Sequence, residues 1–407
     1  NFNVDNRRII NLSNFKKLNN TFQSKAFINL SCFFIILLPN ARFFFKYLSF
    51  QPVLGFCFYA FFIHIILNFL AKNKNSQCLK DFVSKPLIIT LIFAFILIVV
   101  SYLYPIADGL KEQMRGSDQD DCVILGVNFL SRLTNPYSQY SYGGNPCSTG
   151  LGIIILYFPF VISGFYQLGS ISSLILSIFS INIFTKEKYR ALIFSFVLLS
   201  SLIFLELMIV GSDLIFIGSG IVFITYYMNT LLKTRNISKL VFLSIFAGLI
   251  ASSRINFLIL IPLLTLFIVS NWKKGAFIFL TISLSIAIIP SAFIYFSDPQ
   301  QFMPLHLLGK SDLLLKYGLK EFAIFLTISM VIISFRISSK ESGNIPLCLF
   351  LSLSPSLICL SLGDLIFQSS FNIARWEGAN YLVPIIPLAA SLLAKNSLLK
   401  GDFNKRK

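Results

Sequence analysis

Long apolar runs are the feature that most constrains what this chain can fold into. Residues 86–104, 188–210 and 275–296 each approach or exceed the roughly 20 residues that a helix needs to cross about 30 Å of hydrocarbon. Apolar residues make up 56% of the chain and charged residues 13%, so a single soluble core could not bury all these runs. Backbone groups in lipid must pair within their own segment, which makes the runs helical. We therefore expect an all-α fold, a polytopic transmembrane helical bundle.

Basic residues give the chain a formal net charge of +17, and they gather in short connections between the apolar runs. This placement is typical of cytoplasmic loops beside an anionic lipid surface, and it argues against nucleic acid as a partner. The basic clusters occupy residues 7–25, 72–85, 186–190, 233–239, 273–274, 336–340 and 395–407.

The basic clusters also predict an orientation. With both termini cytoplasmic, residues 106–149 and the loops 297–320 and 362–380 fall outside, and we expect about 12 crossings. Between residues 150 and 184 only an odd number of crossings fits both flanks, either one with an interfacial or re-entrant piece or three short ones. The expected divisions are 1–105 (cytoplasmic tail and first transmembrane helices), 106–149 (an external acidic loop with an interfacial helix) and 150–407 (the rest of the bundle).

Several kinds of chemistry are not indicated. The seven cysteines and two histidines lack the spacing of a zinc or redox centre, and no glycine-rich phosphate loop is present. Cys122 and Cys147 both fall in the predicted external loop, where an oxidising compartment would allow a disulfide. The alternative is that they are two small apolar side chains filling space.

The external acidic loop concentrates charge next to the membrane. Ser117 is predicted to cap an interfacial helix over residues 118–132, with Asp118 and Asp120 at its first and third positions. On this helix Asp118 and Asp121 share a face while Asp120 points elsewhere. Capping and the helix dipole account for one acid rather than three, so capping and a functional acid site both stay open as interpretations.

At this point the residues resemble a family. Membrane glycosyltransferases of the GT-C class, which use polyprenyl-phosphate sugars and include bacterial mannosyltransferase-like members, carry an acidic cluster in their first large external loop. Here the similar elements are Asp118-Gln-Asp-Asp121, Asn135-Pro-Tyr137 and Gly144-Asn-Pro146. Ala251-Ser-Ser-Arg254 and Arg375-Trp-Glu377 resemble later pieces of the family. One departure from the family is that two additional segments precede the acidic loop.

The resemblance implies a GT-C-like fold and a sugar transferase on the extracytoplasmic side of a membrane, with the bacterial plasma membrane as the expected location. It implies that Asp118 and Asp121 activate the acceptor, with Asp120 as a stand-in. A divalent cation such as Mg²⁺ or Mn²⁺ held by these acids is left open. The residues expected to bind substrate are Arg115, Tyr137, Arg254, His306 and Arg375.

The residue types suit this chemistry without the family. A carboxylate can take the proton of an acceptor hydroxyl while positive charge grows at the anomeric carbon. Arginine and other cationic groups would stabilise the leaving polyprenyl phosphate. The expected partners are the bilayer, a polyprenyl-phosphate sugar donor and a glycan, lipid or protein acceptor. For Arg254, snorkelling at a helix end is the ordinary alternative, and interfacial solvation is the alternative for His306.

Two other function classes stay open. A transporter or flippase for lipid-linked glycans would place charges near the middle of the bilayer, whereas most charges here fall at predicted helix ends. A glycan polymerase or ligase would favour external arginines and histidine over a loop with three acids.

Overall fold

The computed structural model describes residues 24–48, 50–73, 86–113, 117–185, 188–338 and 344–398. Within these ranges the chain is helical and forms no strand, which confirms the all-α prediction. The first helices are α2 (Lys25–Leu37), η1 (Leu38–Asn40), α3 (Ala41–Tyr47), α4 (Pro52–Asn73), α6 (Pro86–Gly109), η2 (Leu110–Gln113), α7 (Asp121–Ser131), α8 (Leu151–Ile162), α9 (Gln167–Thr185), α10 (Lys188–Ser200) and α11 (Leu202–Ile209). They continue as α12 (Asp213–Thr234), α13 (Ile237–Ser252), η3 (Ile255–Phe257), α14 (Leu260–Val269), α15 (Lys273–Ser297), η4 (Met303–Leu305), α16 (His306–Leu314), α17 (Leu319–Ser338), α18 (Ile345–Gly363), η6 (Asp364–Gln368), η7 (Ile373–Arg375), η8 (Glu377–Ile385) and α19 (Ile386–Leu398).

Eight helical stretches among the described residues are long and apolar enough to cross a membrane. The number rises to ten if two bent pairs, α10 with α11 and η4–α16 with α17, each count as one span. Helices α8 and α13 and the η3–α14 stretch are apolar but shorter. The described helices therefore give the chain the character of a multi-pass membrane protein.

One predicted crossing is not continuous. The apolar run 188–210 forms two helices, α10 and α11, that meet at an angle of 76°. Asn40 lies at the break, where its Oδ1 accepts hydrogen bonds from the Ile203 N–H at 2.8 Å and from Ser201 Oγ at 3.4 Å. Because a distant side chain satisfies a backbone donor at the start of α11, the helix can restart in a new direction.

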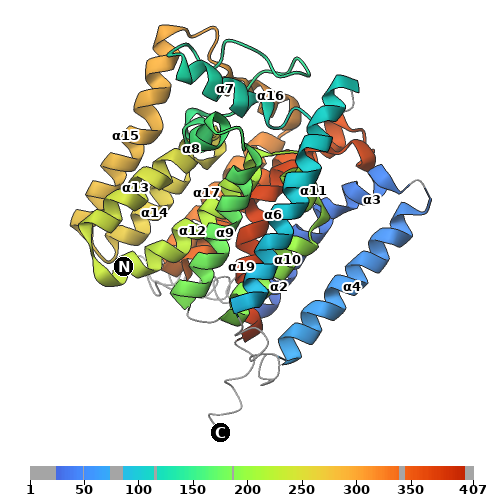
Figure 1. Cartoon of the computed structure of the whole chain (residues 1–407). Helices are drawn as coiled ribbons and strands as arrows, with labels where there is room; N and C mark the ends of the chain where they lie inside the picture. Colours follow the sequence, from blue (N-terminus) through green and yellow to red (C-terminus); the bar gives the residue numbers. More distant parts are fainter. Residues whose placement is uncertain are drawn as a thin grey trace, which may run out of the picture.

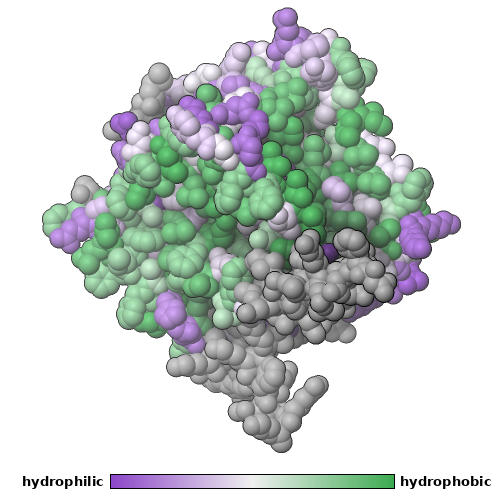
Figure 2. Space-filling model, turned by 180° about the vertical axis from the view of Figure 1, so that it is seen from behind, coloured by the Kyte–Doolittle hydropathy of each residue, from purple (hydrophilic) through white to green (hydrophobic). Residues whose placement is uncertain are grey.

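The bundle has a buried centre and an apolar periphery. Helices α12, α18 and α19 are largely buried, whereas few side chains of α4, α6 and α15 are buried. Helix α4 lies at the outer edge of the bundle (Figure 1) and exposes large apolar side chains such as Phe58, Phe61 and Phe62. Viewed from behind, hydrophobic surface covers the middle of the molecule and hydrophilic residues gather towards its top and edges (Figure 2). Apolar surface of this extent suits contact with lipid.

The polar loops lie at the opposite end of the bundle from the basic turn between α12 and α13. Helix α12 begins at Asp213 and α13 ends at Ser252, and an ion pair between Asp213 and Arg254 holds these two ends together. The turn between the helices, with Lys233 and Arg235, therefore lies about 33 Å away, the length of a 22-residue helix at roughly 1.5 Å per residue. Helices α7 and α16 lie at the top of Figure 1, and residues of both line a pocket together with Leu214 at the start of α12.

Glycines bring α8 and α13 into direct backbone contact beside this polar end. The Gly150 N–H donates to the Ser253 carbonyl at 2.7 Å. A Cβ at Gly150 would lie only 1.8 Å from the Ser252 carbonyl oxygen, and one at Gly152 only 1.9 Å from that of Leu249. This approach places the segment before α8 directly against the segment that carries Arg254.

Candidate functional site

Among the described acids of the loop 106–149, Asp118 is the one that lines a polar pocket. Ser141 Oγ and Asn145 Nδ2 each donate to its Oδ2 at 2.8 Å. Its Oδ1 accepts no hydrogen bond from any described residue. The carboxylate is thus held in place by two neutral donors and keeps one oxygen with capacity to accept a proton or hydrogen bond.

Asp120 is buried beneath the loop. Tyr104 Oη donates to its Oδ2 at 2.6 Å, and Lys111 Nζ lies 2.7 Å from its Oδ1. Burial raises the pKa of Asp120 above its usual value, although its hydrogen bonds with Lys111 and Tyr104 act in the opposite direction. Both oxygens are engaged, so Asp120 anchors the loop to α6.

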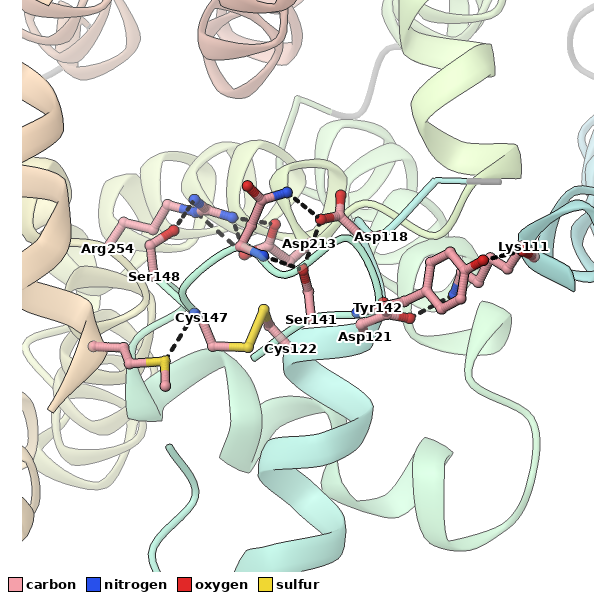
Figure 3. The surroundings of a disulfide bond; sticks show 12 residues. Lys111, Asp118, Asp121, Cys122, Ser141, Tyr142, Cys147, Ser148, Asp213 and Arg254 are labelled. Carbon is pink, nitrogen blue, oxygen red and sulfur yellow. Dashed lines mark hydrogen bonds and ion pairs between the residues drawn. A yellow bond between two sulfur atoms is a disulfide. The ribbon is translucent and has the colours of Figure 1, made fainter. Parts of the chain in front are cut away.

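Asp121 is turned away from the pocket and towards Lys111 (Figure 3). Its Oδ1 lies 2.6 Å from Lys111 Nζ, and its Oδ2 accepts the Tyr142 N–H at 2.8 Å. Lys111 also pairs with Asp108 at 2.6 Å. Burial lowers the pKa of Lys111, but the hydrogen bonds to its three aspartates outweigh burial and raise the pKa above the ordinary value.

The predicted geometry of this helix was wrong. Helix α7 begins at Asp121, and Asp120 rather than Ser117 occupies the N-cap position, without a side-chain capping bond. Asp120 and Asp121 share Lys111, while Asp118 lies apart in the preceding turn. The reason is that Lys111 attracts the two adjacent acids, whereas Ser141 and Asn145 from the far side of the loop bind Asp118. Asp118 and Asp121 therefore do not form a pair.

A disulfide between Cys122 and Cys147 closes the loop. It joins the first turn of α7 to the segment leading into α8, next to the groups that hold Asp118 (Figure 3). The Cys147 N–H also donates to Met303 Sδ at 3.2 Å, which ties the same segment to η4. Of the two sequence interpretations of these cysteines, the structure supports the disulfide.

Arg254 is oriented by a buried carboxylate. Its Nη2 lies 2.7 and 2.9 Å from the two oxygens of Asp213, and its Nη1 donates to Ser148 Oγ at 3.3 Å. Asp213 is fully buried, while 17% of the Arg254 side chain is exposed. A paired guanidinium of this kind has a fixed direction, so Arg254 is not simply snorkelling at a helix end.

The polar pocket has a volume of about 190 Å³ and draws residues from all three loops predicted to be external. Asp118 and Arg254 line it together with His306 and Lys310 from α16 and Glu377 from η8. The further lining residues are Gln119, Cys122, Ser141, Asn145, Pro146, Ser148, Thr149, Leu214, Asn380 and Tyr381.

An apolar groove of about 310 Å³ lies next to the polar pocket. The groove is formed by the end of α13, η3, the C-terminal half of α15 and η4. Its side chains include Ile288, Phe296 and Phe302. Phe296 is among the exposed apolar side chains, so this wall faces outward from the bundle. Arg254 lines both the groove and the polar pocket, and it therefore marks their junction.

Other predicted substrate-binding residues lie elsewhere. Arg375 is exposed in η7 and lines neither pocket. Tyr137 is buried in a small apolar cluster, stacked edge-on against Phe302, and burial raises the pKa of its hydroxyl. Arg115 lies outside the described residues.

Sequence reasoning did not select Glu377 or Asn380 as site residues, although both lie in or near a quoted motif. Asn145 lies in the Gly-Asn-Pro motif and was not among the predicted site residues either. All three line the polar pocket. The spacing of Glu377 and Asn380 gave no sign that they would lie near Asp118, because residues more than 200 positions apart converge only through the packing of the helices. Asn145 is 27 positions from Asp118, and its contact depends on how the loop folds back.

The described carboxylates of the polar pocket do not form a metal site. Among the described residues, no group of three or more histidine, cysteine, aspartate and glutamate side chains is arranged to hold an ion. Asp118 and Glu377 are the carboxylates that line the polar pocket. These two alone do not fit a dedicated Mg²⁺ or Mn²⁺ site of several oxygen ligands, and we derive no step through a metal.

In comparisons with known proteins, no family model, no curated protein and no solved structure matched the chain. The function is therefore inferred from the chemistry of the site. A carboxylate with an unengaged oxygen, an oriented guanidinium and an apolar groove meet within a small region. Together they suit an anionic molecule with a polar head and an apolar tail.

Proposed function

We propose that the chain is a GT-C-like integral membrane glycosyltransferase. It transfers a sugar from a polyprenyl-phosphate donor to a glycan, lipid or protein acceptor on the extracytoplasmic side. The observation that carries this proposal is the position of Arg254 at the junction of an apolar groove and a polar pocket that contains Asp118.

The donor would bind across this junction. Its polyprenyl chain would lie in the groove between η3, α15 and η4, whose wall includes the exposed side chain of Phe296. Its phosphate contacts the Arg254 guanidinium, and Lys310 and His306 supply further donors from α16. Asp213 offsets part of the charge on Arg254 but fixes its direction, so that Nη1 remains available beside Ser148.

The transfer step follows from this placement. The acceptor oxygen forms a bond to the anomeric carbon as the bond from that carbon to the phosphate oxygen breaks. The bonding electron pair leaves with the polyprenyl phosphate, whose growing charge Arg254 stabilises. The acceptor proton passes to Asp118 Oδ1, a general-base contribution of about 10²–10⁴ in rate.

The finer architecture belongs to the same proposal. About 12 crossings result if α13 and α14 cross the membrane in addition to the ten candidate spans. Basic turns would face the cytoplasm with both termini, and the acidic loop would face outward from a bacterial plasma membrane. The Cys122–Cys147 disulfide supports an oxidising environment for that loop.

The location of the charges favours an enzyme over a transporter or flippase. A transport pathway would place ionisable groups deep within the bundle. Asp118, Arg254 and Glu377 instead gather at one end, and α12 carries only uncharged side chains from Leu214 to Leu232.

Replacing Arg254 tests the donor site. Arg254→Lys keeps the charge beside Asp213 but loses the forked geometry, so we expect the KM for the polyprenyl-phosphate donor to rise about tenfold or more, with a smaller change in kcat. The double variant Asp213→Asn/Arg254→Gln avoids an unpaired buried carboxylate and should fold while losing donor binding. The measurement is sugar transfer by purified protein, with release of polyprenyl phosphate followed in parallel. Donor kinetics equal to wild type in both variants would contradict the proposed donor site.

A further inference from the structure

Asn380 lines the polar pocket, and a residue from a distant helix fixes how its amide is turned. Arg42 of α3 reaches η8 and donates from Nη1 to Asn380 Oδ1 at 2.6 Å. The two residues are 338 positions apart in the chain. This contact links helix α3 to the pocket wall.

The contact allows only one amide orientation. Arginine carries donors and no acceptor, so the oxygen of Asn380 must face Arg42 and its NH₂ group must face away. The Asn380 Nδ2 makes no hydrogen bond to a described residue. It is also absent from the fully buried side-chain atoms that lack a partner, which means that this nitrogen is accessible. Asn380 therefore presents hydrogen-bond donors to the pocket.

Asn145 has the opposite orientation. Its Nδ2 donates to Asp118 Oδ2, which leaves the side-chain oxygen Oδ1 of Asn145 as the free group. Glu377, whose carboxylate has no hydrogen-bond or ion-pair partner among the described residues, adds a further acceptor to the same pocket. The pocket thus combines a fixed donor with several acceptors, a pattern that suits the hydroxyl groups of a sugar, each of which can both donate and accept.

We infer that Asn380 is a specificity-determining residue that donates from its amide to an oxygen of the transferred sugar, with Arg42 as its positioning residue. This inference rests on the proposed function. It adds that the pocket wall formed by Asn380 recognises the sugar rather than the phosphate. The ligand group is an uncharged acceptor oxygen, either a ring hydroxyl or the carbonyl of an acetamido substituent.

Asn380→Asp separates this role from folding. Aspartate has nearly the same shape and can accept from Arg42 with both oxygens. One of these bonds can come from Arg42 Nε, which is buried and has no hydrogen-bond partner among the described residues. The contact between α3 and η8 is therefore retained or strengthened. The donors towards the pocket are lost, so affinity for a sugar-bearing ligand should fall about tenfold or more.

Two short-chain ligands make the test specific: a prenyl phosphate that carries a hexose and the same prenyl phosphate without a sugar. Binding of each is measured with purified protein in detergent, alongside the unfolding midpoint. In Asn380→Asp we expect the hexose-bearing ligand to bind no better than the sugar-free one, with affinity for the sugar-free ligand and the midpoint unchanged. Asn380→Asp protein that binds both ligands as tightly as wild type would overturn the inference.

Variants on α3 test the positioning role. Arg42→Ala lets the Asn380 amide turn and should weaken only the hexose-bearing ligand, whereas Arg42→Lys keeps a donor and should restore most of the affinity. Lys46→Gln is the matched control, because Lys46 lies on the same helix but pairs with Glu206 outside the pocket. Equal loss in Arg42→Lys and Arg42→Ala would contradict positioning by Arg42.

If wild type binds neither ligand, the proposed donor class fails and this inference fails with it. If Asn380→Asp also loses affinity for the sugar-free ligand, the result contradicts the role of Asn380 in sugar recognition but leaves the proposed donor class standing.

Discussion

Individual side chains decide how negative charge is divided at the polar end of the bundle. Lys111 ion-pairs with Asp108, Asp120 and Asp121, while Asp118 takes only neutral donors from Ser141 and Asn145. Both oxygens of Asp120 and of Asp121 are already engaged, by Lys111 and by Tyr104 or the Tyr142 N–H, so taking a proton from a substrate would break these contacts. The division leaves Asp118 as the acid of this loop best placed to take a proton from a substrate.

Lys111→Met tests this division of charge. Three carboxylates would then lie together without a counter-charge, and we expect a loss of about 3 kcal/mol in the free energy of unfolding near neutral pH. The pKa of Asp120 is already raised by burial and would rise further. Because the folded protein would bind protons more tightly than the unfolded chain, the loss should shrink as the pH falls through the window between the raised pKa and the ordinary aspartate value.

The measurement is the unfolding midpoint in detergent between neutral and mildly acidic pH. Lys320→Met serves as control, since Lys320 pairs with Asp312 on the exposed surface and its loss should matter little. An unfolding midpoint of Lys111→Met that stays equal to wild type at every pH would show that Lys111 does not hold the acids.

At the residue scale the sequence supported part of the site. The acidic cluster, Arg254 and His306 were selected from residue type and predicted side of the membrane, and Asp118, Arg254 and His306 do line one pocket. The register of α7 and the role of Lys111 could not be predicted, because they depend on which acid an amine nine or ten positions earlier reaches. The pairing of Asp213 with Arg254 could not be predicted either, because it depends on the packing of α12 against α13.

At the scale of elements, the close approach of α8 and α13 positions the two segments that meet at Ser148 and Arg254. Apolar runs predicted most of the long helices, since length and composition suffice for that. The bend between α10 and α11 was not predictable, because the Asn40 side chain that stabilises it comes from another part of the chain.

Gly150→Ala tests this close approach. The added Cβ would overlap the Ser252 carbonyl, and since backbone cannot move aside cheaply we expect a loss of at least about 2 kcal/mol in the free energy of unfolding. Gly109→Ala is the control, because a Cβ there meets nothing within 4 Å and alanine favours the end of α6. The comparison is made by denaturant or thermal unfolding of purified protein. Equal stability of Gly150→Ala and wild type would mean that α8 and α13 lie further apart than described.

At the scale of the whole molecule, the chain separates its chemistry from its basic surface. The polar pocket occupies one end of the bundle, and the basic turn between α12 and α13 lies at the other. Helical content and multi-pass character followed from apolar runs and from the placement of lysine and arginine. The junction of groove and pocket did not, because residues from α13, α15, α16 and η8 form it only after the bundle has assembled.

The most direct test of the central claim is sugar transfer by Asp118→Asn beside Asp121→Asn. Asparagine at 118 can still accept from Ser141 and Asn145, so it should fold normally while lacking a basic oxygen. We predict that transfer from a polyprenyl-phosphate sugar falls by at least ~10² in Asp118→Asn at an unchanged unfolding midpoint. In Asp121→Asn we predict that folded protein keeps most of its activity and that the midpoint falls, because Lys111 loses a partner. Full transfer activity in folded Asp118→Asn would contradict the account.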